Sequence, residues 1–488
     1  MESMALLRDC AIQIIRTLRE RGHQAYLVGG CVRDLLLGRE PADYDVATDA
    51  TPDQVMKIFP ETYAVGAQFG VVLVPVAGEA AATAREKTED AGEGARATRA
   101  EAADRAQTNH SKAHAVEVAT FRSDLGYSDG RHPDEVRFSK DPREDLARRD
   151  FTINGMMLDI TPDGELPDPI SGGLLDFVGG RKDLESQVIR AIGDPELRFA
   201  EDKLRMLRGV RFAARFDYTI EPTTLAAIRK LAPEISQVSR ERVRDELTKM
   251  LTEGQARRAF LLLDETGLLR EVLPEISAMK GVEQPPEFHP EGDVFVHTLL
   301  LLGNLPHPSP ATLAWGALLH DVGKPPTFRV EDRIRFNGHV EVGVKMAEEI
   351  CGRMRFSNDD TDQILALVDN HMRFGHVQRM KESTLKKFIR LPRFEEHMEL
   401  HRLDCRGSHG DLTTYNFMLE KIANMPPEVV RPAPLITGRD LIEAGYEPGP
   451  LFKEILSEVE DAQLEGRLQS REQAMEFVRE RFPNPKLL

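Results

Sequence analysis

The sequence predicts an α+β protein in which a small head containing β-strands precedes a long helical body. Short runs rich in β-branched residues occur at residues 24–28, 70–76 and 115–121, where they predict strands. From about Leu184 onward, apolar residues recur instead at the spacing of amphipathic helices. At 488 residues the chain exceeds one ordinary hydrophobic core, so we expect several structural units.

Charge and composition limit the possible functions. The net charge of −17 argues against a protein that coats nucleic acid non-specifically, so any RNA contact requires a local basic surface. The cysteines lack the spacing of metal ligands and predict reduced thiols; they are Cys10, Cys31, Cys351 and Cys405. Without a signal peptide or an apolar run that could span a bilayer, we expect a cytoplasmic protein with no membrane partner. The sequence leaves the oligomeric state open.

The head begins with an amphipathic helix over residues 4–21, followed by a strand that ends at Gly29 and Gly30. A further helix and a loop lead to Asp43 and Asp45 at the start of the next strand. Because side chains alternate along a strand, both carboxylates face the same side and repel each other unless a cation lies between them. Mg²⁺ prefers such oxygen ligands, and the glycine pair lets backbone N–H groups approach a triphosphate. These residues predict metal-dependent nucleotidyl transfer.

Glu117 is the expected third carboxylate of this site. It lies between Val116 and Val118 in a predicted strand, where a charged side chain is costly unless it is exposed, paired or bound to a metal. An exposed glutamate on an edge strand is the alternative. Residues 77–112, with almost no large apolar side chains, predict a disordered insertion between two strands, and a solvated Ala-rich helix is the alternative there.

A second cluster of charge lies in residues 144–157, which begin with EDLARRDFTINGM. Its two arginines could clamp phosphates, and Asp150 or Asn154 could bind a ribose hydroxyl. An ordinary surface network of arginines and carboxylates is the alternative, and in isolation it is the preferred one.

The helical body supplies a third cluster in residues 201–216, EDKLRMLRGVRFAARF. On a helical wheel the arginines occupy one side and the apolar residues the other, and Asp202 and Arg205 are expected to be surface neighbours. The candidate helices of this region are 197–216, 222–231, 240–251 and 255–263. Breaks rich in Pro and Gly complete a division into a head (1–160), a neck and body (161–280), a histidine-rich helical domain (281–425) and a tail (426–488).

Taken together, the motifs resemble a known family. YLVGGCVRDLLLG with DYD, RRDFTINGM and EDKLRMLRGVRF resemble the bacterial class of tRNA nucleotidyltransferases, the CCA-adding enzymes, and their poly(A) polymerase relatives. TFRSDLGYSDGRHPDEVRF resembles the flexible loop of that family, and RERVRDELTKML resembles its later helical motif. The resemblance covers roughly residues 20–260 and implies a polymerase-β-like head on a helical neck, body and tail. Two features depart from it: Gly155 replaces a usual alanine, and residues 77–112 are an extra insertion.

The resemblance assigns roles to individual residues. It implies Mg²⁺ on Asp43 and Asp45, and nucleotide contacts from Gly30, Arg33, Arg149, Asp150, Asp202, Arg205, Arg208 and Arg211. Asp202 and Arg205 resemble the pair that reads the incoming base. Cytosine and adenine both present an amino donor beside a ring-nitrogen acceptor, so a carboxylate next to a guanidinium selects them over guanine and uracil.

The histidine-rich domain resembles a second family. VHTLLLL, LLHDVGKP and HRLDC resemble the pieces of an HD-type phosphohydrolase, which implies the metal ligands His297, His320, Asp321 and Asp404. His339 and His371 resemble the additional ligands of its two-metal members. Imidazole and carboxylate together suit Mg²⁺ or a transition metal such as Mn, Ni or Fe.

The expected function is the addition of CCA, or of its terminal A, to the 3′ end of tRNA from CTP and ATP. The alternatives are a poly(A) polymerase, or a protein that acts mainly as an HD phosphohydrolase with an inactive transferase head. The expected contact surface for RNA phosphates and the acceptor arm is basic; it comprises Arg240, Arg242, Arg244 and Lys249, with Arg257 and Arg258 nearby.

Overall fold

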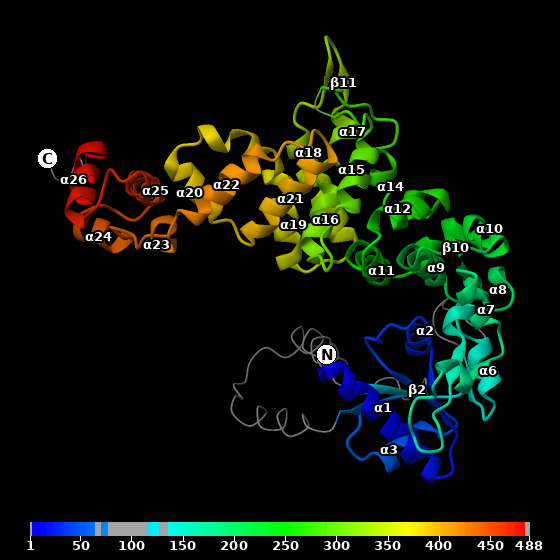
Figure 1. The fold of residues 1–488 in the computed structure, drawn as a ribbon. Helices are drawn as coiled ribbons and strands as arrows, with labels where there is room; N and C mark the ends of the chain where they lie inside the picture. The colour runs from blue at the N-terminus through cyan, green and yellow to red at the C-terminus, as the bar shows by residue number, and fades with distance from the viewer. Residues whose placement is uncertain (1, 64–69, 77–114, 126–134, 288, 484–488) are drawn as a thin grey trace. The chain divides into compact units, whose positions relative to one another are not determined.

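The computed structural model describes residues 2–63, 70–76, 115–125, 135–287 and 289–483 (Figure 1). The chain divides into two compact units, of which the first comprises Met1–Arg242 with Glu265–Val272, and the second Val243–Asp264 with Leu273–Leu488. The predicted α+β class is confirmed. The finer division into four domains stays a prediction, and the predicted insertion at 77–112 lies outside the described residues.

The first unit is built on a six-stranded mixed sheet with the strand order β3-β4-β2-β1-β7-β8. Its strands are β1 Ala25–Val28, β2 Asp45–Thr48, β3 Val71–Pro75, β4 Ala115–Thr120, β7 Met156–Leu158 and β8 Leu174–Asp176. β2 and β4 run parallel, whereas β3 pairs with β4 in the antiparallel sense. The sequence did not predict β7 and β8, because strands of three residues show no alternating pattern.

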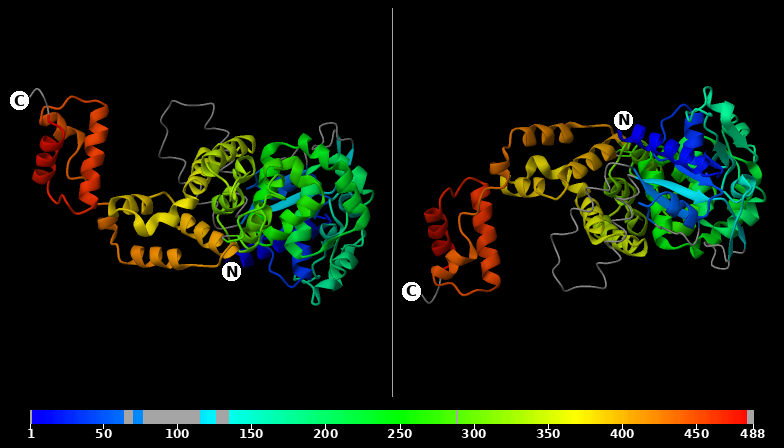
Figure 2. Two further views of the ribbon diagram at one scale, coloured as in Figure 1. Left: turned by 90° about the horizontal axis from the view of Figure 1, so that it is seen from above. Right: turned by 90° about the horizontal axis from the view of Figure 1, so that it is seen from below.

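Helices and a small hairpin cover this sheet. α1 (Glu2–Glu20) and α3 (Pro52–Ile58), both in the blue part of the ribbon, pack against its strands (Figure 2). Ile14, Ile15 and Leu18 of α1 are buried. Leu146 packs with Ala47 and therefore lies on the face of β2 that also carries Asp45. The remaining elements near this face are α2 Gly30–Leu36, α6 Pro142–Ala147, η3 Thr152–Asn154, β5 Arg122–Leu125 and β6 Glu135–Phe138.

The helical continuation of the first unit differs from the prediction at one point. The predicted single helix over 197–216 is wrong, because the chain forms α8 (Pro195–Glu201) and α9 (Leu204–Phe216) with a break at Asp202. Asp202 is extended there, with φ −145°, and its carboxylate accepts a hydrogen bond from the N–H of Leu204 at 3.1 Å. The other elements of this part are η4 Ile170–Gly173, α7 Gly180–Glu185, β9 Val188–Ile189, β10 Thr219–Ile220, α10 Pro222–Leu231, η5 Ala232–Gln237 and α13 Leu268–Val272.

The second unit is helical apart from one short hairpin in its described part. It begins within α11 Arg240–Thr252, whose first three residues belong to the first unit, and includes α12 Ala256–Glu265 except for its last residue. Its next helices are α14 Pro274–Ser277, α15 Val294–Gly303, α16 Ala311–Leu319 and α17 Lys324–Thr327. The hairpin of β11 Arg329–Val330 and β12 Ile334–Arg335 follows. Next come α18 His339–Arg353, α19 Asn358–Asn370, η6 His371–Arg379, α20 Glu382–Ile389, α21 Phe394–Gly407 and α22 Thr413–Ala423. Among the described helices, none is both long and apolar enough to cross a membrane.

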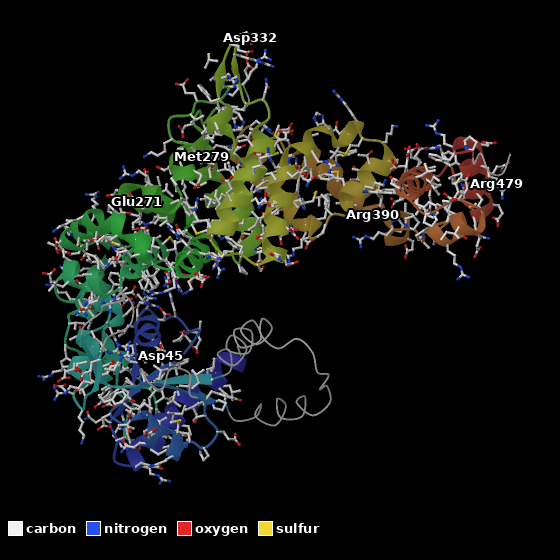
Figure 3. The ribbon with its side chains drawn as sticks, turned by 180° about the vertical axis from the view of Figure 1, so that it is seen from behind. Asp45, Glu271, Met279, Asp332, Arg390 and Arg479 are labelled. Atoms are coloured by element: carbon white, nitrogen blue, oxygen red, sulfur yellow. The ribbon has the colours of Figure 1, made fainter. Side chains whose placement is uncertain are left out.

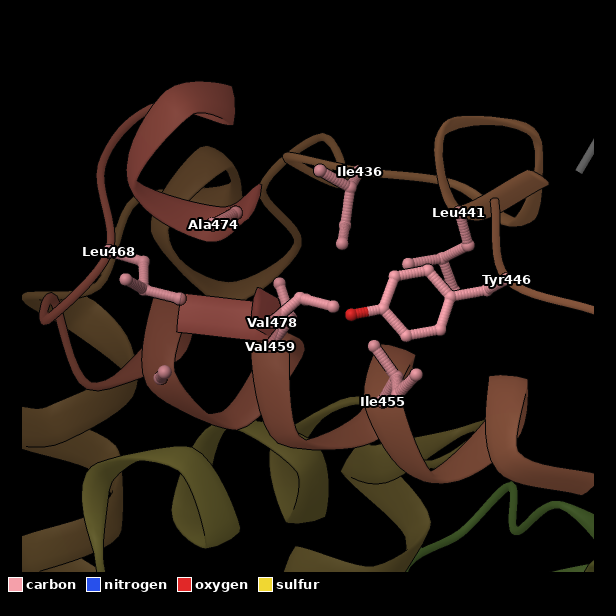
Figure 4. Packing of buried hydrophobic residues seen from close by; sticks show 9 residues of the cluster. Ile436, Leu441, Tyr446, Ile455, Val459, Leu468, Ala474 and Val478 are labelled. Atoms are coloured by element: carbon pink, nitrogen blue, oxygen red, sulfur yellow. The ribbon is translucent and has the colours of Figure 1, made fainter. Parts of the chain in front are cut away.

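The C-terminal segment has a hydrophobic core of its own. Its helices are α23 Pro427–Val430, α24 Gly438–Glu443, α25 Pro450–Leu464 and α26 Arg471–Arg481. Ile455 and Val459 of α25 pack with Val478 of α26 and with Tyr446 (Figure 4). The hydroxyl of Tyr446 donates a hydrogen bond to the carbonyl of Phe482 at 2.8 Å, so that its buried ring keeps a polar partner.

Candidate functional sites

Two carboxylates meet on neighbouring strands of the head. Asp45 of β2 lies directly opposite Glu117 of β4 in the parallel register, and Val46 lies opposite Val118. Burial alternates along β4, so that the valines on either side of Glu117 face the core on the other side. Because β4 lies between β3 and β2, the alternative of an exposed edge-strand glutamate does not apply.

The carboxylates of Asp45 and Glu117 line a cavity of about 210 Å³. The lining also includes Arg122, Arg148 and Arg149, so that the cavity holds both acidic and basic side chains. Asp43 is exposed just before β2 and is separated from Asp45 by the buried Tyr44 (Figure 3 labels Asp45). Carboxylates in this arrangement, two of them in register and a third nearby, are the oxygen donors that Mg²⁺ accepts.

Gly29 belongs to the wall of this site. Its φ of +80° lies in the left-handed region, and a Cβ atom there would lie 3.1 Å from Nη1 of Arg149 and 4.0 Å from Oδ2 of Asp45. A side chain at this position would therefore press on the arginine. Gly30 begins α2 directly afterwards, so the predicted turn from strand to helix is present.

The arginine pair is anchored by a residue that the sequence did not single out. Asp145 of α6 is fully buried, and its Oδ1 accepts from Nε and Nη2 of Arg148 at 3.0 and 2.6 Å. Its Oδ2 accepts from Nη2 of Arg149 at 3.1 Å. Burial alone raises the pKa of Asp145, but the two guanidinium groups more than offset this and lower it. The spacings of three and four residues could have revealed the pair of contacts.

Asp150 and Asn154 connect α9 with α2. Oδ2 of Asp150 accepts from Nη2 of Arg208 at 2.7 Å, and Oδ1 accepts from the N–H of Phe151 at 2.8 Å. Asn154 donates to Asp150 and accepts from Nη1 of Arg33 at 2.7 Å. Burial raises the pKa of Asp150, but Arg208 opposes it and brings the pKa to about 2. Four predicted nucleotide-binding residues thus form one hydrogen-bonded chain.

Arginine side chains lie against two aromatic rings of α9. Phe212 and Phe216 are nearly parallel, with ring centroids 6.2 Å apart. The guanidinium of Arg33 lies 4.6 Å from the centroid of Phe216, and that of Arg211 lies 4.5 Å from the centroid of Phe212. Cation–π contacts of this kind hold positive side chains in place near a site that would receive phosphates.

The two side chains of the predicted base-reading pair bind different partners. Asp202 accepts from Nη1 and Nη2 of Arg242 at 3.2 and 2.7 Å. Arg205 donates instead to Glu201 at 2.5 Å and to the carbonyl of Arg148 at 3.2 Å. Asp202 and Arg205 do not share one helical face, because Asp202 precedes α9 in an extended conformation. They are still neighbours, since the N–H of Arg205 donates to the carbonyl of Asp202 at 3.0 Å.

The predicted RNA surface is partly engaged within the protein. Arg242 is paired with Asp202, and Arg244 donates to the carbonyl of Arg355 and to Asp245. Lys249 keeps 48% of its side chain exposed and lies 3.5 Å from Glu246, whereas Arg240 is half-buried at the start of α11. Lys249 is therefore the better placed of the four to contact a partner.

The histidine-rich domain brings together all six of its predicted ligands. His297 of α15 lies 3.1 Å from Asp404 of α21, measured from Nε2 to Oδ1. Nε2 of His320 lies 3.2 Å from Oδ2 of Asp321, and Nε2 of His339 and of His371 lie 3.9 and 3.8 Å from Oδ1 of the same aspartate. These groups come from α15, α18 and α21 and from the residues directly after α16 and α19, and these helices pack around one centre.

The chemistry of this cluster fits a metal ion. Nε2 of His339 and of His371 are buried without a hydrogen-bond partner among the described residues, which is costly unless a ligand satisfies them. Burial opposes the charge of Asp321, but His320 and Lys324 lower its pKa well below the usual range, so it is an anion. Burial lowers the pKa of His371 to about 4, which keeps its imidazole neutral and able to ligate.

Both candidate metal sites lie in regions that match known domain families, except for Asp404, which follows the match to the HD domain. Residues 25–109 and 94–190 match the "Poly A polymerase head domain", and residues 217–280 match the "Probable RNA and SrmB- binding site of polymerase A". Residues 294–400 match the "HD domain". The fold is thus that of a nucleotidyltransferase head joined to a helical body and an HD domain.

Similarity to individual proteins identifies the family. The chain is 34% identical to the "Multifunctional CCA protein" of Paraburkholderia phymatum, over 79% of this chain and 84% of that protein. It is 36% identical to the "CCA-adding enzyme" of Bacillus licheniformis over 55% of this chain, and the match spans about half (56%) of that relative's length. The solved Bacillus stearothermophilus CCA-adding enzyme in complex with CTP matches with 27% identity and a TM-score of 0.68, covering 96% of this chain and 97% of that one. The chain belongs to the family of CCA-adding tRNA nucleotidyltransferases and poly(A) polymerases, in the branch that carries an HD domain.

Proposed function

We propose that this protein transfers nucleotides from CTP and ATP to the 3′ end of tRNA, adding CCA or its terminal A without a nucleic-acid template. The observation that carries the proposal is the register of Asp45 with Glu117 in one cavity with Arg148 and Arg149. The names of the relatives, CCA-adding enzymes and multifunctional CCA proteins, support the choice of tRNA as acceptor. With these substrates the protein would work in the cytoplasm.

The proposed reaction joins the 3′ oxygen of the RNA to the α-phosphorus of the nucleotide and breaks the bond to pyrophosphate. Asp43, Asp45 and Glu117 would hold Mg²⁺, which when bound neutralises phosphate charge and lowers the pKa of the attacking hydroxyl. Arg148 and Arg149 would neutralise the triphosphate, and Asp145 holds both in place for it. Gly29 and Gly30 leave room for the phosphates at the start of α2.

Base selection is assigned to the surface around α9. Asp202 and Arg205 would present an acceptor and a donor to the incoming base, with Arg208 and Arg211 nearby. Arg208 of α9 donates a hydrogen bond to Asp150. Asn154 donates to the same aspartate and accepts from Arg33, so these hydrogen bonds connect α9 with Arg33. The same contacts would therefore couple the position of the base to that of the triphosphate.

The test supplies tRNA that ends before CCA, after the first C or after both C residues. Each is incubated with CTP, ATP or both, and the products are sized. The proposal expects addition that stops at CCA; long A tails would instead show a poly(A) polymerase. Asp43→Ala should abolish incorporation while the circular dichroism spectrum stays unchanged, and residual activity near that of the wild type would contradict the assignment.

We also propose that the HD domain hydrolyses a phosphoester with a divalent metal. The observation that favours it is that the buried Nε2 atoms of His339 and His371 have no hydrogen-bond partner among the described residues and both face Asp321. The test combines metal analysis of the purified protein with an assay on a 2′,3′-cyclic phosphate and on a phosphomonoester. Asp321→Ala should abolish hydrolysis and leave nucleotide incorporation intact. Hydrolysis that accompanies a complete lack of incorporation in the wild type would favour a protein that acts mainly through its HD domain.

A further inference from the structure

We infer that Glu291 is a positioning residue of the HD site, which holds His297 so that its Nε2 faces the metal. The inference rests on the proposed metal site. Oε1 of Glu291 lies 2.7 Å from Nδ1 of His297, on the side of the ring away from Asp404. The carboxylate of Glu291 is buried, with 6% of its side chain exposed, so water does not compete for this contact.

Three of the four histidines of the cluster share one arrangement. Nδ1 of His320, His339 and His371 each lies 2.7 to 3.0 Å from the backbone carbonyl three residues earlier in the chain. A carbonyl only accepts, so these Nδ1 atoms carry the proton and each Nε2 is left with the lone pair that a metal needs. At His297 the group next to Nδ1 is a side-chain carboxylate, Oε1 of Glu291 at 2.7 Å, in place of a carbonyl.

The helix around His297 explains why a carboxylate is needed there. His320 and His371 follow the last residues of α16 and α19, and His339 is the first residue of α18, so a backbone carbonyl lies within reach. His297 lies inside α15, where the carbonyl of Val294 already accepts from the hydroxyl of Thr298 at 2.9 Å. Another acceptor must therefore come from outside the helix, and Glu291 supplies it from the preceding loop.

Glu291 also serves a second histidine. Nδ1 of His289 lies 2.8 Å from the same Oε1, while Oε2 of Glu291 has no hydrogen-bond partner among the described residues. The contact with His297 is short, but its angle leaves Nδ1 without a well-directed hydrogen bond. A small rotation of the carboxylate would give each histidine its own oxygen. One buried anion can thus orient His297 and be held in place by His289.

A separate metal site made of His289, Glu291 and His297 is the competing interpretation. Ligands at about 2.0–2.2 Å from one ion lie about 3 Å or more from each other. The two N···O distances of 2.7 and 2.8 Å are shorter and match hydrogen bonds. Carboxylates that accept from the far nitrogen of a ligating histidine raise its basicity, and their loss costs about 10–100-fold in metal affinity.

The test titrates the full-length, metal-free protein with Ni²⁺ by calorimetry and records both affinity and the number of ions bound. Ni²⁺ is chosen because imidazole ligands favour it. Glu291→Gln keeps the shape of the side chain but removes its charge. We expect an affinity about 10–100-fold lower at an unchanged number of ions. Glu287→Gln, at an exposed position of the same loop, is the matched control and should bind like the wild type.

Three outcomes would overturn parts of this inference. Unchanged affinity in Glu291→Gln would remove the positioning role. Loss of one bound ion, with the remaining affinity unaltered, would make Glu291 a ligand of its own site. Asp321→Ala should abolish the tight Ni²⁺ binding of the wild type; if the wild type shows no such binding, the proposed metal site itself fails. Melting curves of the metal-free variants separate a loss of positioning from a loss of folding, because only the latter lowers the midpoint without metal.

Discussion

Asp202 accepts hydrogen bonds from both terminal nitrogens of Arg242, at 3.2 and 2.7 Å. This paired contact joins the break between α8 and α9 to the first turn of α11. It places Arg242 beside the proposed base reader, whereas the sequence predicted it on the RNA surface. A residue that interacts with the proposed base reader should influence which nucleotide is added.

Arg242→Ala should therefore weaken nucleotide selection. Without its partner, Asp202 is free to adopt other rotamers, and we expect discrimination against GTP and UTP to fall about tenfold, which corresponds to about 1.4 kcal/mol. The measurement compares incorporation of all four nucleotides into tRNA that ends in CC. A fall in tRNA affinity with unchanged nucleotide choice would return Arg242 to the RNA surface.

Lys249 offers the contrasting case, because its side chain is 48% exposed. Lys249→Ala should weaken tRNA binding and reduce the slope of log affinity against log salt by about 1, while nucleotide choice stays the same. Arg439→Ala is a suitable control, because Arg439 is also exposed, at 87%, but lies on α24, outside residues 217–280 that match the RNA-binding region. An identical salt slope in both variants would argue against an RNA contact at Lys249.

Asp145→Asn tests the anchor of the arginine pair. The asparagine fills the same space but removes the charge that Arg148 and Arg149 share, so we expect a higher KM for CTP and ATP. Loss of charge-assisted hydrogen bonds in a buried position should lower the free energy of unfolding by about 2 kcal/mol. Urea unfolding and initial-rate kinetics measure the two effects.

Asp141→Asn is the matched control for this helix. Asp141 caps α6 by accepting from the N–H of Arg143 at 2.9 Å, and asparagine caps a helix about as well as aspartate. Its kinetics and stability should stay close to the wild type. If Asp145→Asn behaves in the same way, the arginines do not depend on Asp145.

Local patterns account for what the sequence could predict. The helix over residues 4–21 and the strand around Glu117 are visible because their apolar residues repeat within a few positions. The paired aspartates could also be recognised, but the register of Asp45 with Glu117 depends on a pairing of β2 with β4 that spacing does not encode. The sequence does not predict the helix break at Asp202, because neither glycine nor proline occurs there.

Buried charges explain most of what the sequence did not show. Asp145 and Glu291 look like ordinary surface carboxylates in the sequence, and only the fold places them inside. In the same way, Arg242 and Arg244 counted as part of a basic surface until their partners Asp202 and Arg355 were known. Charge patterns predict where charge is concentrated, whereas tertiary packing decides whether it faces solvent or another side chain.

The pH dependence of stability should reflect Asp150. Its pKa falls from the ordinary 3.8 to about 2 because Arg208 outweighs the effect of burial. A group whose pKa is lower in the folded state stabilises the protein above its ordinary pKa, and this contribution is lost as the pH falls from about 4 to about 2. At neutral pH it amounts to about 2 kcal/mol.

Asp150→Asn removes this contribution. Thermal unfolding followed by circular dichroism should show a large difference from the wild type above pH 5, and the difference should shrink as the pH falls towards 2.5. Trp315, the single tryptophan of the chain, lies in the second unit, so its fluorescence follows the unfolding of that unit separately. A difference that stays constant with pH would mean that Asp150 contributes through its shape and not through its charge.

Glu117→Gln is the sharpest test of the catalytic assignment, because glutamine keeps the side chain's size between β3 and β2 and removes only its charge. If Glu117 holds Mg²⁺ with Asp45, the rate of nucleotide incorporation should fall about 100-fold or more, as expected for the loss of one preorganised charge at a reacting centre. Single-turnover incorporation of ATP into tRNA ending in CC measures the rate, and tRNA affinity should stay unchanged. Glu61→Gln, at an exposed position of the same unit, should retain full activity. A Glu117→Gln rate within a few-fold of the wild type would restrict the metal-binding set to Asp43 and Asp45.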